Sequence, residues 1–191
     1  MKTGLFFGSF NPVHIGHMAI ANYFVEFTDI DQLWFVVSPH NPLKEKNSLL
    51  DDYARLEMVR LAIGNDARFG VTDIEFRMPQ PSYTIDTLTY LAEKYPDREF
   101  VLIMGSDGLS TFHKWKNYTE IINNYQRYIY PRGNDDTCAE FPKYANIKVV
   151  DAPKIDISST FIRKAIRNKR NVQYFLPEKV FGYIDREGYY K

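Results

Sequence analysis

Residues 5–17 of the chain read LFFGSFNPVHIGH, an apolar run followed by a loop that holds two glycines and two histidines. The run Leu5-Phe6-Phe7 is typical of a buried strand, and Gly8 predicts a tight turn directly after it. Apolar residues then recur at helical spacing from Ile15 to Phe27. The stretch therefore predicts a strand, a glycine-rich loop and a helix in direct succession.

The same alternation continues through the chain. Apolar runs that indicate strands lie at 5–7, 33–37, 69–71, 100–104, 128–130 and 147–150, and helical patterns lie at 15–27, 51–63, 84–95, 115–125, 158–168 and 177–187. Uninterrupted apolar strands that alternate with such helices are typical of a parallel sheet covered on both faces. We expect an α/β fold with a doubly wound, mainly parallel sheet, and ligands bound beyond the carboxyl ends of its strands.

The length of 191 residues is that of one domain, and we expect a single domain over 1–191 with a helical C-terminal part at 151–191. The 24 basic and 24 acidic residues balance, so the net charge provides no general attraction to nucleic acid. Cys138 is the one cysteine, which excludes an internal disulfide and favours a reducing compartment. No signal peptide or membrane span is indicated, so we expect a soluble, cytoplasmic protein with no membrane partner.

The loop after the first predicted strand has the chemistry of an anion site. N–H groups at a helix start lack partners and lie at the positive end of the helix dipole. Gly8 permits a tight turn, and Gly16 lets a ligand approach the main chain. His14 and His17 share one face of the first turn, where both can donate hydrogen bonds to phosphate oxygens. Two core histidines without a ligand are one alternative interpretation of this pair. A zinc site is another, but it would need further Cys, His or carboxylate ligands, so we predict no metal site.

The segment His14-Ile15-Gly16-His17 resembles the HxGH signature of the nucleotidyltransferase superfamily, whose fold is Rossmann-like. The resemblance implies that His14 and His17 contact the phosphates of ATP and stabilise the transition state. It also implies main-chain contacts to the nucleotide around the turn, at Gly8, Ser9, Phe10 and Gly16. Ser9 and Asn11 depart from the family pattern, and neither departure removes a proton donor to phosphate.

A second signature stands at residues 157–163, ISSTFIR, which open a predicted helix. Serine hydroxyls and N–H groups at a helix start bind anions, and Arg163 lies one turn further on the same side. Taken alone, a serine cap beside a solvated arginine is an equal interpretation. The segment resembles the superfamily's ISSTxxR signature, which implies that Ser158, Ser159 and Arg163 hold the β- and γ-phosphates, with Ile157 also at the ATP site.

The acceptor is indicated by residues 81–88, PSYTIDTL. A loop followed by a helix with Thr84 as its cap would explain this stretch alone. The stretch also closely resembles the SYTIDTL segment of bacterial nicotinate mononucleotide adenylyltransferases. That resemblance implies that main-chain groups at Ser82, Tyr83 and Thr84 hold the pyridine carboxylate near a helix start. It further implies that Trp115 stacks on the pyridine ring, although a tryptophan is more often part of a core.

Two further elements match the same family, one just after the predicted strand at 100–104 and one just after the predicted strand at 128–130. Gly105-Ser106-Asp107 resembles its GAD element, which implies that Gly105 and Asp107 meet the ribose hydroxyls of ATP. Arg132 resembles the arginine of a shortened Arg-Pro-Gly element. The resemblance places Arg132 among the residues that bind the acceptor.

The match is weakest at two other places. Lys44 corresponds to the lysine of a Pro-His-Lys element that would neutralise the acceptor phosphate during catalysis, while Leu43 replaces the histidine. Residues 134–142 have no counterpart, and their polar, turn-rich composition predicts a surface loop. The likeness otherwise spans nearly the whole chain.

The resemblance implies an enzyme that moves AMP from ATP to nicotinate mononucleotide, giving nicotinic acid adenine dinucleotide and pyrophosphate. Mg²⁺ is expected with ATP, bound through phosphates and water rather than by dedicated protein ligands. Whether nicotinate or nicotinamide mononucleotide is preferred stays open, as does the oligomeric state, a homo-oligomer included.

Other functions are weighed against this one. Pantetheine-phosphate adenylyltransferase is the nearest alternative, but that family has threonine at the position of His14 and lacks the SYTIDTL segment. A cytidylyltransferase is disfavoured for similar reasons. A nucleotide-binding regulatory module is the alternative from a different class, and it would bind without turnover. A dinucleotide-dependent oxidoreductase is disfavoured because no G-x-G-x-x-G follows the first strand.

Overall fold

The computed structural model describes residues 1–39, 49–132 and 146–191. Its strands are β1 (Lys2–Gly8), β2 (Gln32–Val37), β3 (Phe69–Thr72), β4 (Glu99–Gly105), β5 (Gln126–Tyr130) and β6 (Ile147–Val149). All the predicted strands are confirmed. Leu43, Lys44, Cys138 and the predicted loop at 134–142 lie outside the described residues.

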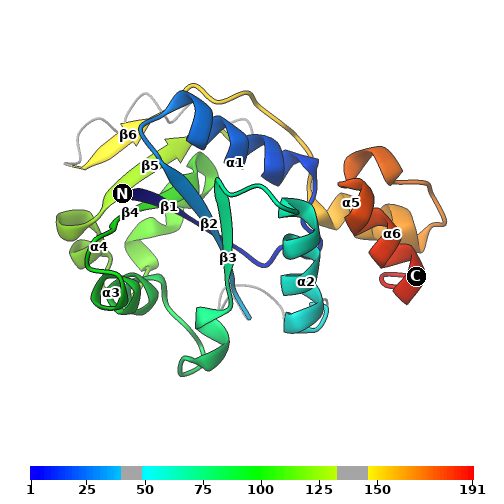
Figure 1. Ribbon diagram of the computed structural model, residues 1–191, viewed down its shortest axis with the longest axis horizontal. Coiled ribbons are helices and arrows are strands. Elements are labelled where there is room, and N and C mark those ends of the chain that lie inside the picture. Colours follow the sequence, from blue (N-terminus) through cyan, green and yellow to red (C-terminus); the bar gives the residue numbers. More distant parts are fainter. Residues whose placement is uncertain (40–48, 133–145) are drawn as a thin grey trace.

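The strands form a parallel sheet in the order β3-β2-β1-β4-β5-β6 (Figure 1). In its register, Phe6 of β1 lies between Phe35 of β2 and Ile103 of β4. The strand order reverses between β1 and β4, and doubly wound sheets bind ligands at the carboxyl ends of the strands beside such a reversal. Gly8 and Gly105 end these two strands, so they mark where a ligand is expected.

The helices separate into two layers. The α-helices are α1 (Ile15–Phe27), α2 (Asp52–Ile63), α3 (Thr84–Lys94), α4 (Tyr118–Asn124), α5 (Ser159–Arg167) and α6 (Glu178–Glu187), and the 3₁₀ helices are η2 (Ile74–Arg77), η3 (Ser106–Lys114) and η5 (Gln173–Phe175). α1 and α2 cover one face of the sheet and α3 and α4 the other (Figure 1). The predicted doubly wound α/β fold is therefore confirmed.

Two hydrophobic cores result, one on each face of the sheet. Side chains along a strand point alternately to opposite faces, so Phe6 packs into the core beside α1 and α2 while Leu5 packs into the core beside α3. Burial on both faces explains why the strands read as uninterrupted apolar runs. Val180 and Ile184 of α6 join the first of these cores, which places the C-terminal helices beside α2 (Figure 1).

The helix boundaries agree with the sequence prediction except near residue 115. Asp51 and Ser158 cap α2 and α5 by accepting main-chain N–H bonds. The helix predicted at 115–125 is wrong in its first turn, because Asn117 has a φ of 49°, a left-handed conformation that an α-helix does not continue through. Thr84 is the first residue of α3 rather than its cap, since the cap position belongs to Tyr83.

Candidate functional site

The turn that follows β1 is closed by an aromatic side chain. Phe10 has a φ of 42°, which folds its ring back over Gly8, where an added Cβ would lie 2.8 Å from the ring. The ring is buried and meets His17 edge-on, with centroids 5.1 Å apart. Gly8 is thus required by Phe10, and the Phe10 side chain belongs to the core while only its main chain is available for a nucleotide.

The two histidines of the loop lie against each other. Their rings stack with centroids 3.7 Å apart and planes 28° apart. His14 precedes α1 as its cap residue, and its main-chain N–H donates to Nδ1 of His17 at 3.2 Å. Because Nδ1 of His17 accepts, the neutral ring carries its proton on Nε2, which is then the donating nitrogen.

His14 is a buried polar side chain without a hydrogen bond. The residue is 3% exposed, and neither ring nitrogen has a partner among the described residues. Burial, assisted by the positive charge of Arg132, lowers the pKa of His14 to about 4. A buried polar group normally finds a partner, so an unpaired imidazole at a helix start indicates a position made for a ligand.

Gly16 has a packing role in addition to the contact with ATP that is predicted for it. A Cβ at residue 16 would lie 3.1 Å from Nδ1 of His14 and 3.3 Å from Ile155. The missing side chain therefore makes room for the His14 ring and for the segment that leads to α5. Contact between Gly16 and ATP stays a prediction.

The start of α5 is bonded directly to the loop after β1. The Ser159 hydroxyl donates to the Pro12 carbonyl at 2.9 Å, and Nη1 of Arg163 donates to the Asn11 carbonyl at 2.8 Å. Ser158 accepts the N–H of Phe161 as a helix cap. The structure therefore brings the two predicted phosphate-binding segments together, although they lie about 150 residues apart in the sequence.

The end of β4 adds a third group of predicted residues. A Cβ at Gly105 would lie 2.5 Å from Oδ1 of Asp107 and 3.0 Å from the Arg132 side chain. Asp107 and Arg132 form an ion pair of 3.6 Å, and the Ser106 hydroxyl exchanges hydrogen bonds with the main chain of Arg132. Arg132 thus lies beside the residues predicted for ATP, and its contact with the acceptor stays a prediction.

The residues predicted for the acceptor form a second cluster. Lys116 forms an ion pair of 2.8 Å with Asp86 and lies 4.7 Å from the centre of the Tyr83 ring. This joins the segment of Trp115 to the start of α3, where Ser82, Tyr83 and Thr84 lie. Half-buried Trp115 packs on Phe112. η3 links the two clusters, because it begins at Ser106 and ends next to Trp115.

Comparison with known proteins shows the family of the chain. The cytidylyltransferase-like family matches residues 5–165. A relative from Flavobacterium psychrophilum, named "probable nicotinate-nucleotide adenylyltransferase", is 54% identical over 192 residues and the match covers the whole of both chains. The chain belongs to the nicotinate-nucleotide adenylyltransferase family. A relative of the same name from Bacteroides fragilis is 47% identical over 181 residues, covering 94% of this chain and 89% of the relative.

Solved adenylyltransferase structures share the fold. Nicotinic acid mononucleotide adenylyltransferase of Plasmodium falciparum in complex with NaAD has a TM-score of 0.82 at 20% identity, covering 99% of this chain and 97% of that chain. The same protein in complex with APC has a TM-score of 0.80. At this identity the likeness concerns the fold.

The loops of the protein are held by a buried arginine that sequence reasoning missed. Arg55 of α2 is fully buried, and each of its five N–H donors has an acceptor. The acceptors are the main-chain carbonyls of Leu50, Ser9, Ser38 and Pro39 and the carboxylate of Asp52. One guanidinium therefore ties the loop after β1 to the loop after β2. An arginine among the apolar residues of a predicted helix was the available signal.

Glu75 is a second residue that the sequence did not reveal. Its carboxylate is buried on η2 and accepts the hydroxyls of Thr87 at 2.8 Å and Ser82 at 3.0 Å. Burial raises the pKa of Glu75, while hydrogen bonds from Thr87, Ser38 and Ser82 oppose that rise. Because the Ser82 hydroxyl is committed to Glu75, the main chain of this segment is what it can offer to a ligand.

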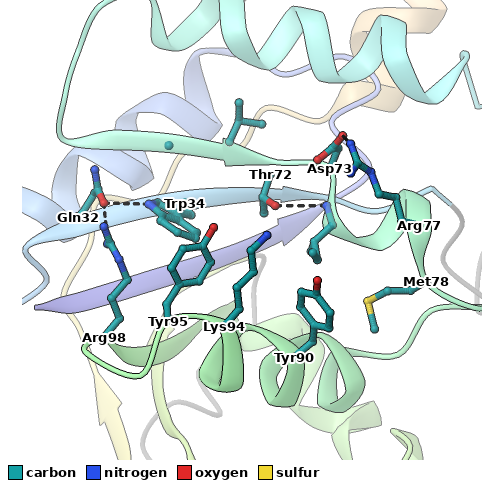
Figure 2. A pocket seen from close by; sticks show the side chains of 13 residues that line it. Gln32, Trp34, Thr72, Asp73, Arg77, Met78, Tyr90, Lys94, Tyr95 and Arg98 are labelled. Atoms are coloured by element: carbon teal, nitrogen blue, oxygen red, sulfur yellow. Dashed lines mark hydrogen bonds and ion pairs between the residues drawn. The ribbon is translucent and has the colours of Figure 1, made fainter.

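A groove of about 530 Å³ lies elsewhere in the protein, between α3 and the sheet at β2 and β3 (Figure 2). Trp34 and Tyr95 meet inside it with ring centroids 5.2 Å apart, and the Arg98 guanidinium lies 4.7 Å from the centre of the Trp34 ring. None of the predicted site residues lines the groove. It is therefore separate from the two clusters.

The residues that the structure describes were also compared with the patterns of a metal site and of a membrane-spanning helix. Within them, no three His, Cys, Asp or Glu side chains gather into a group that could hold a metal ion. None of the helices there is both long and apolar enough to cross a membrane.

Proposed function

We propose that the chain transfers the adenylyl group of ATP to nicotinate mononucleotide, giving nicotinic acid adenine dinucleotide and pyrophosphate. The observation that carries the proposal is the stacked pair of His14 and His17 at the start of α1, bonded through the intervening loop to Ser159 and Arg163 of α5. Two helix starts and an arginine at one place supply the partial and full positive charges that a triphosphate requires.

In the proposed ATP complex, the main chain at Gly8, Ser9, Phe10 and Gly16 lies along the nucleotide. His17 donates through Nε2 to the phosphate at which charge builds up, with His14 beside it. Residues 157–159 and Arg163 hold the β- and γ-phosphates. Arg163 suits this role because it makes no ion pair with a described carboxylate, so its positive charge is available to the phosphates of ATP. Gly105 and Asp107 face the ribose.

In the proposed acceptor complex, the first N–H groups of α3 hold the pyridine carboxylate. Such groups have no acceptor inside the helix, and the helix dipole favours an anion over the neutral carboxamide of the nicotinamide form. Ser82, Tyr83 and Thr84 provide this end of the site, with Trp115 stacked on the ring. Arg132 and Lys44 are proposed to approach the acceptor phosphate, Lys44 from outside the described residues.

The proposed reaction needs no general base. A phosphate oxygen of the acceptor attacks the α-phosphorus of ATP in line, the bond from that phosphorus to the bridging oxygen of the β-phosphate breaks, and pyrophosphate leaves with the electron pair. The acceptor phosphate is already ionised near neutral pH, so alignment and charge stabilisation provide the catalysis. ATP enters as its Mg²⁺ complex, with the ion held by phosphate oxygens and water.

Pyrophosphate release tests the proposal. Purified protein is supplied with Mg²⁺ and ATP together with nicotinate mononucleotide, nicotinamide mononucleotide or phosphopantetheine in separate reactions. We expect the highest kcat/KM with nicotinate mononucleotide. Release that requires phosphopantetheine would assign the chain to the alternative adenylyltransferase. ATP binding without turnover with any acceptor would favour the regulatory module.

A further inference from the structure

The loop between β1 and α1 is held through its carbonyl groups by distant side chains. The Ser9 carbonyl accepts from Nη1 of Arg55, and the Asn11 carbonyl accepts from Nη1 of Arg163 at 2.8 Å. The Pro12 carbonyl accepts from the start of α5 at 2.9 Å. These donors belong to α2 and α5, so the position of the loop is set by two other elements of the fold.

The same bonds aim the N–H groups of the loop. In a trans peptide the C=O group and the N–H group of the next residue point in opposite directions. Since the carbonyl of Ser9 faces Arg55, the N–H of Phe10 points away from that guanidinium. The N–H of Val13 likewise points away from α5, to which the Pro12 carbonyl is bonded. Fixing the Ser9 carbonyl therefore fixes the N–H of Phe10, whose main chain is proposed to contact ATP.

The side chain of Asn11 receives a further bond from the end of the chain. Asn11 is 1% exposed, and its amide oxygen accepts the hydroxyl of Tyr190 at 2.7 Å and the N–H of Leu50 at 3.3 Å. Residues 11 and 190 are 179 positions apart. The bond joins the C-terminal turn to the middle of the loop that precedes His14.

The C-terminal turn is built to make this bond. Gly188 ends α6 in a left-handed conformation, and the N–H of Tyr189 closes the helix on the Ile184 carbonyl. Tyr190 itself has a φ of 65°, a conformation that residues with side chains adopt rarely. Burial raises the pKa of Tyr190, although the positive charges of Arg163 and Arg55 oppose this rise. The hydroxyl therefore stays protonated and donates a hydrogen bond to Asn11.

We propose that Tyr190 is a positioning residue of the ATP site, acting through Asn11 on the loop that carries His14 and the N–H of Phe10. The proposal rests on the proposed function, because it assigns that loop to ATP. It gives the last turn of the chain a part in nucleotide binding that no motif in the sequence indicates.

Tyr190→Phe tests the proposal, because it removes one oxygen and keeps the ring. We expect the Kd of ATP, measured by calorimetry without acceptor, and the KM for ATP to rise about 3- to 10-fold, the range of one hydrogen bond. The KM for nicotinate mononucleotide should not change, because the acceptor cluster lies elsewhere. Tyr189→Phe is the matched control, since the Tyr189 ring packs against Tyr183 with centroids 5.6 Å apart.

A purely structural role is separated by the same measurements. If Tyr190→Phe only destabilised the fold, Tm and the apparent kcat would fall, but the ATP affinity of the folded fraction would be unchanged. Coupling through Asn11 is tested by a double-mutant cycle: Tyr190→Phe should weaken ATP binding little further when Asn11→Ala is already present. Full additivity of the two changes would contradict the proposal.

Two outcomes overturn the proposal outright. One is wild-type ATP affinity in Tyr190→Phe, and the other is an equal loss in Tyr189→Phe. Failure of the proposed function is distinguishable, because it would be seen as wild-type protein that binds ATP but releases no pyrophosphate with nicotinate mononucleotide.

Discussion

The imidazole of His14 stacks on the imidazole of His17 with ring centroids 3.7 Å apart, and the main-chain N–H of His14 donates to Nδ1 of its neighbour. The two stacked rings differ in their hydrogen bonding. His17 is oriented by a hydrogen bond and by the edge of Phe10, whereas the ring nitrogens of His14 have no partner in the described part of the chain. A phosphate that reaches both rings would complete the hydrogen bonding of the buried one.

His17→Ala should lower kcat far more than it weakens ATP binding. Loss of one aligned donor to developing charge costs about 10²- to 10³-fold in kcat, while the main-chain donors of the loop stay in place. Steady-state pyrophosphate release and calorimetric ATP titration provide the two numbers. Equal losses in kcat and affinity would refute the transition-state role, and exposed His113→Ala is the control.

The buried His14 should make the protein sensitive to acid. Its pKa is about 4 in the folded protein and 6.5 in the unfolded chain, so below pH 6.5 the unfolded state binds the proton first and folding loses free energy until pH 4. The loss from pH 7 to pH 5 should reach about 2 kcal/mol at most.

Urea unfolding of wild type and His14→Gln at both pH values measures this effect. The free energy of unfolding of wild type should fall more steeply toward pH 5 than that of the variant. Carboxylates titrate in both proteins, so the difference between the two slopes isolates the histidine. Parallel slopes would mean that His14 titrates normally.

Arg55→Lys should destabilise the protein although it keeps the charge. Lysine offers three donors from one atom and cannot reach five acceptors spread over three segments. Leaving buried carbonyls unpaired should reduce the free energy of unfolding by about 3 kcal/mol. Arg60→Lys, on the exposed side of the same helix, should change it by less than about 0.5 kcal/mol. Equal stability of both variants would disprove the clamp.

Glu75→Gln should weaken binding of the acceptor and leave binding of ATP unchanged. The carboxylate fixes Ser82 and Thr87, which precede and belong to the first turns of α3, and an amide can accept at only one of its two ends. We expect the KM for nicotinate mononucleotide to rise about 3- to 10-fold, with the KM for ATP unchanged. Exposed Glu93→Gln on α3 is the control. A shift in the KM for ATP instead would place Glu75 with the other substrate.

The sequence revealed the parts of the fold that depend on local patterns. The helix from Ile15 to Phe27 has the predicted bounds, because its apolar spacing and its glycine-rich entry are both local. The helix predicted at 115–125 was wrong in its first turn, because the left-handed conformation of Asn117 is a property of one residue that helical spacing does not indicate. η3 was not predicted for a similar reason, since a 3₁₀ helix lacks the 3.6-residue period.

The residues of the candidate site also differ in whether a local sequence pattern indicates them. His14, His17, Ser159 and Arg163 belong to short motifs, so they could be found in the sequence, and the structure brings them together. Arg55 and Tyr190 contact segments far away in the sequence, and Glu75 contacts residues 7 and 12 positions further on. No pattern in one sequence specifies such contacts. The roles assigned to all these residues in binding and catalysis stay predictions until variants are measured.

The ring of Phe10 has a consequence for how this loop can vary. A methyl group at residue 8 would collide with that ring, and the ring cannot withdraw because it is wedged among Phe6, Phe35 and His17. Random mutagenesis should therefore recover substitutions of Gly8 only in combination with a smaller residue at position 10. A path that changes Gly8 first is therefore closed, whereas a smaller residue at position 10 would have to come before it.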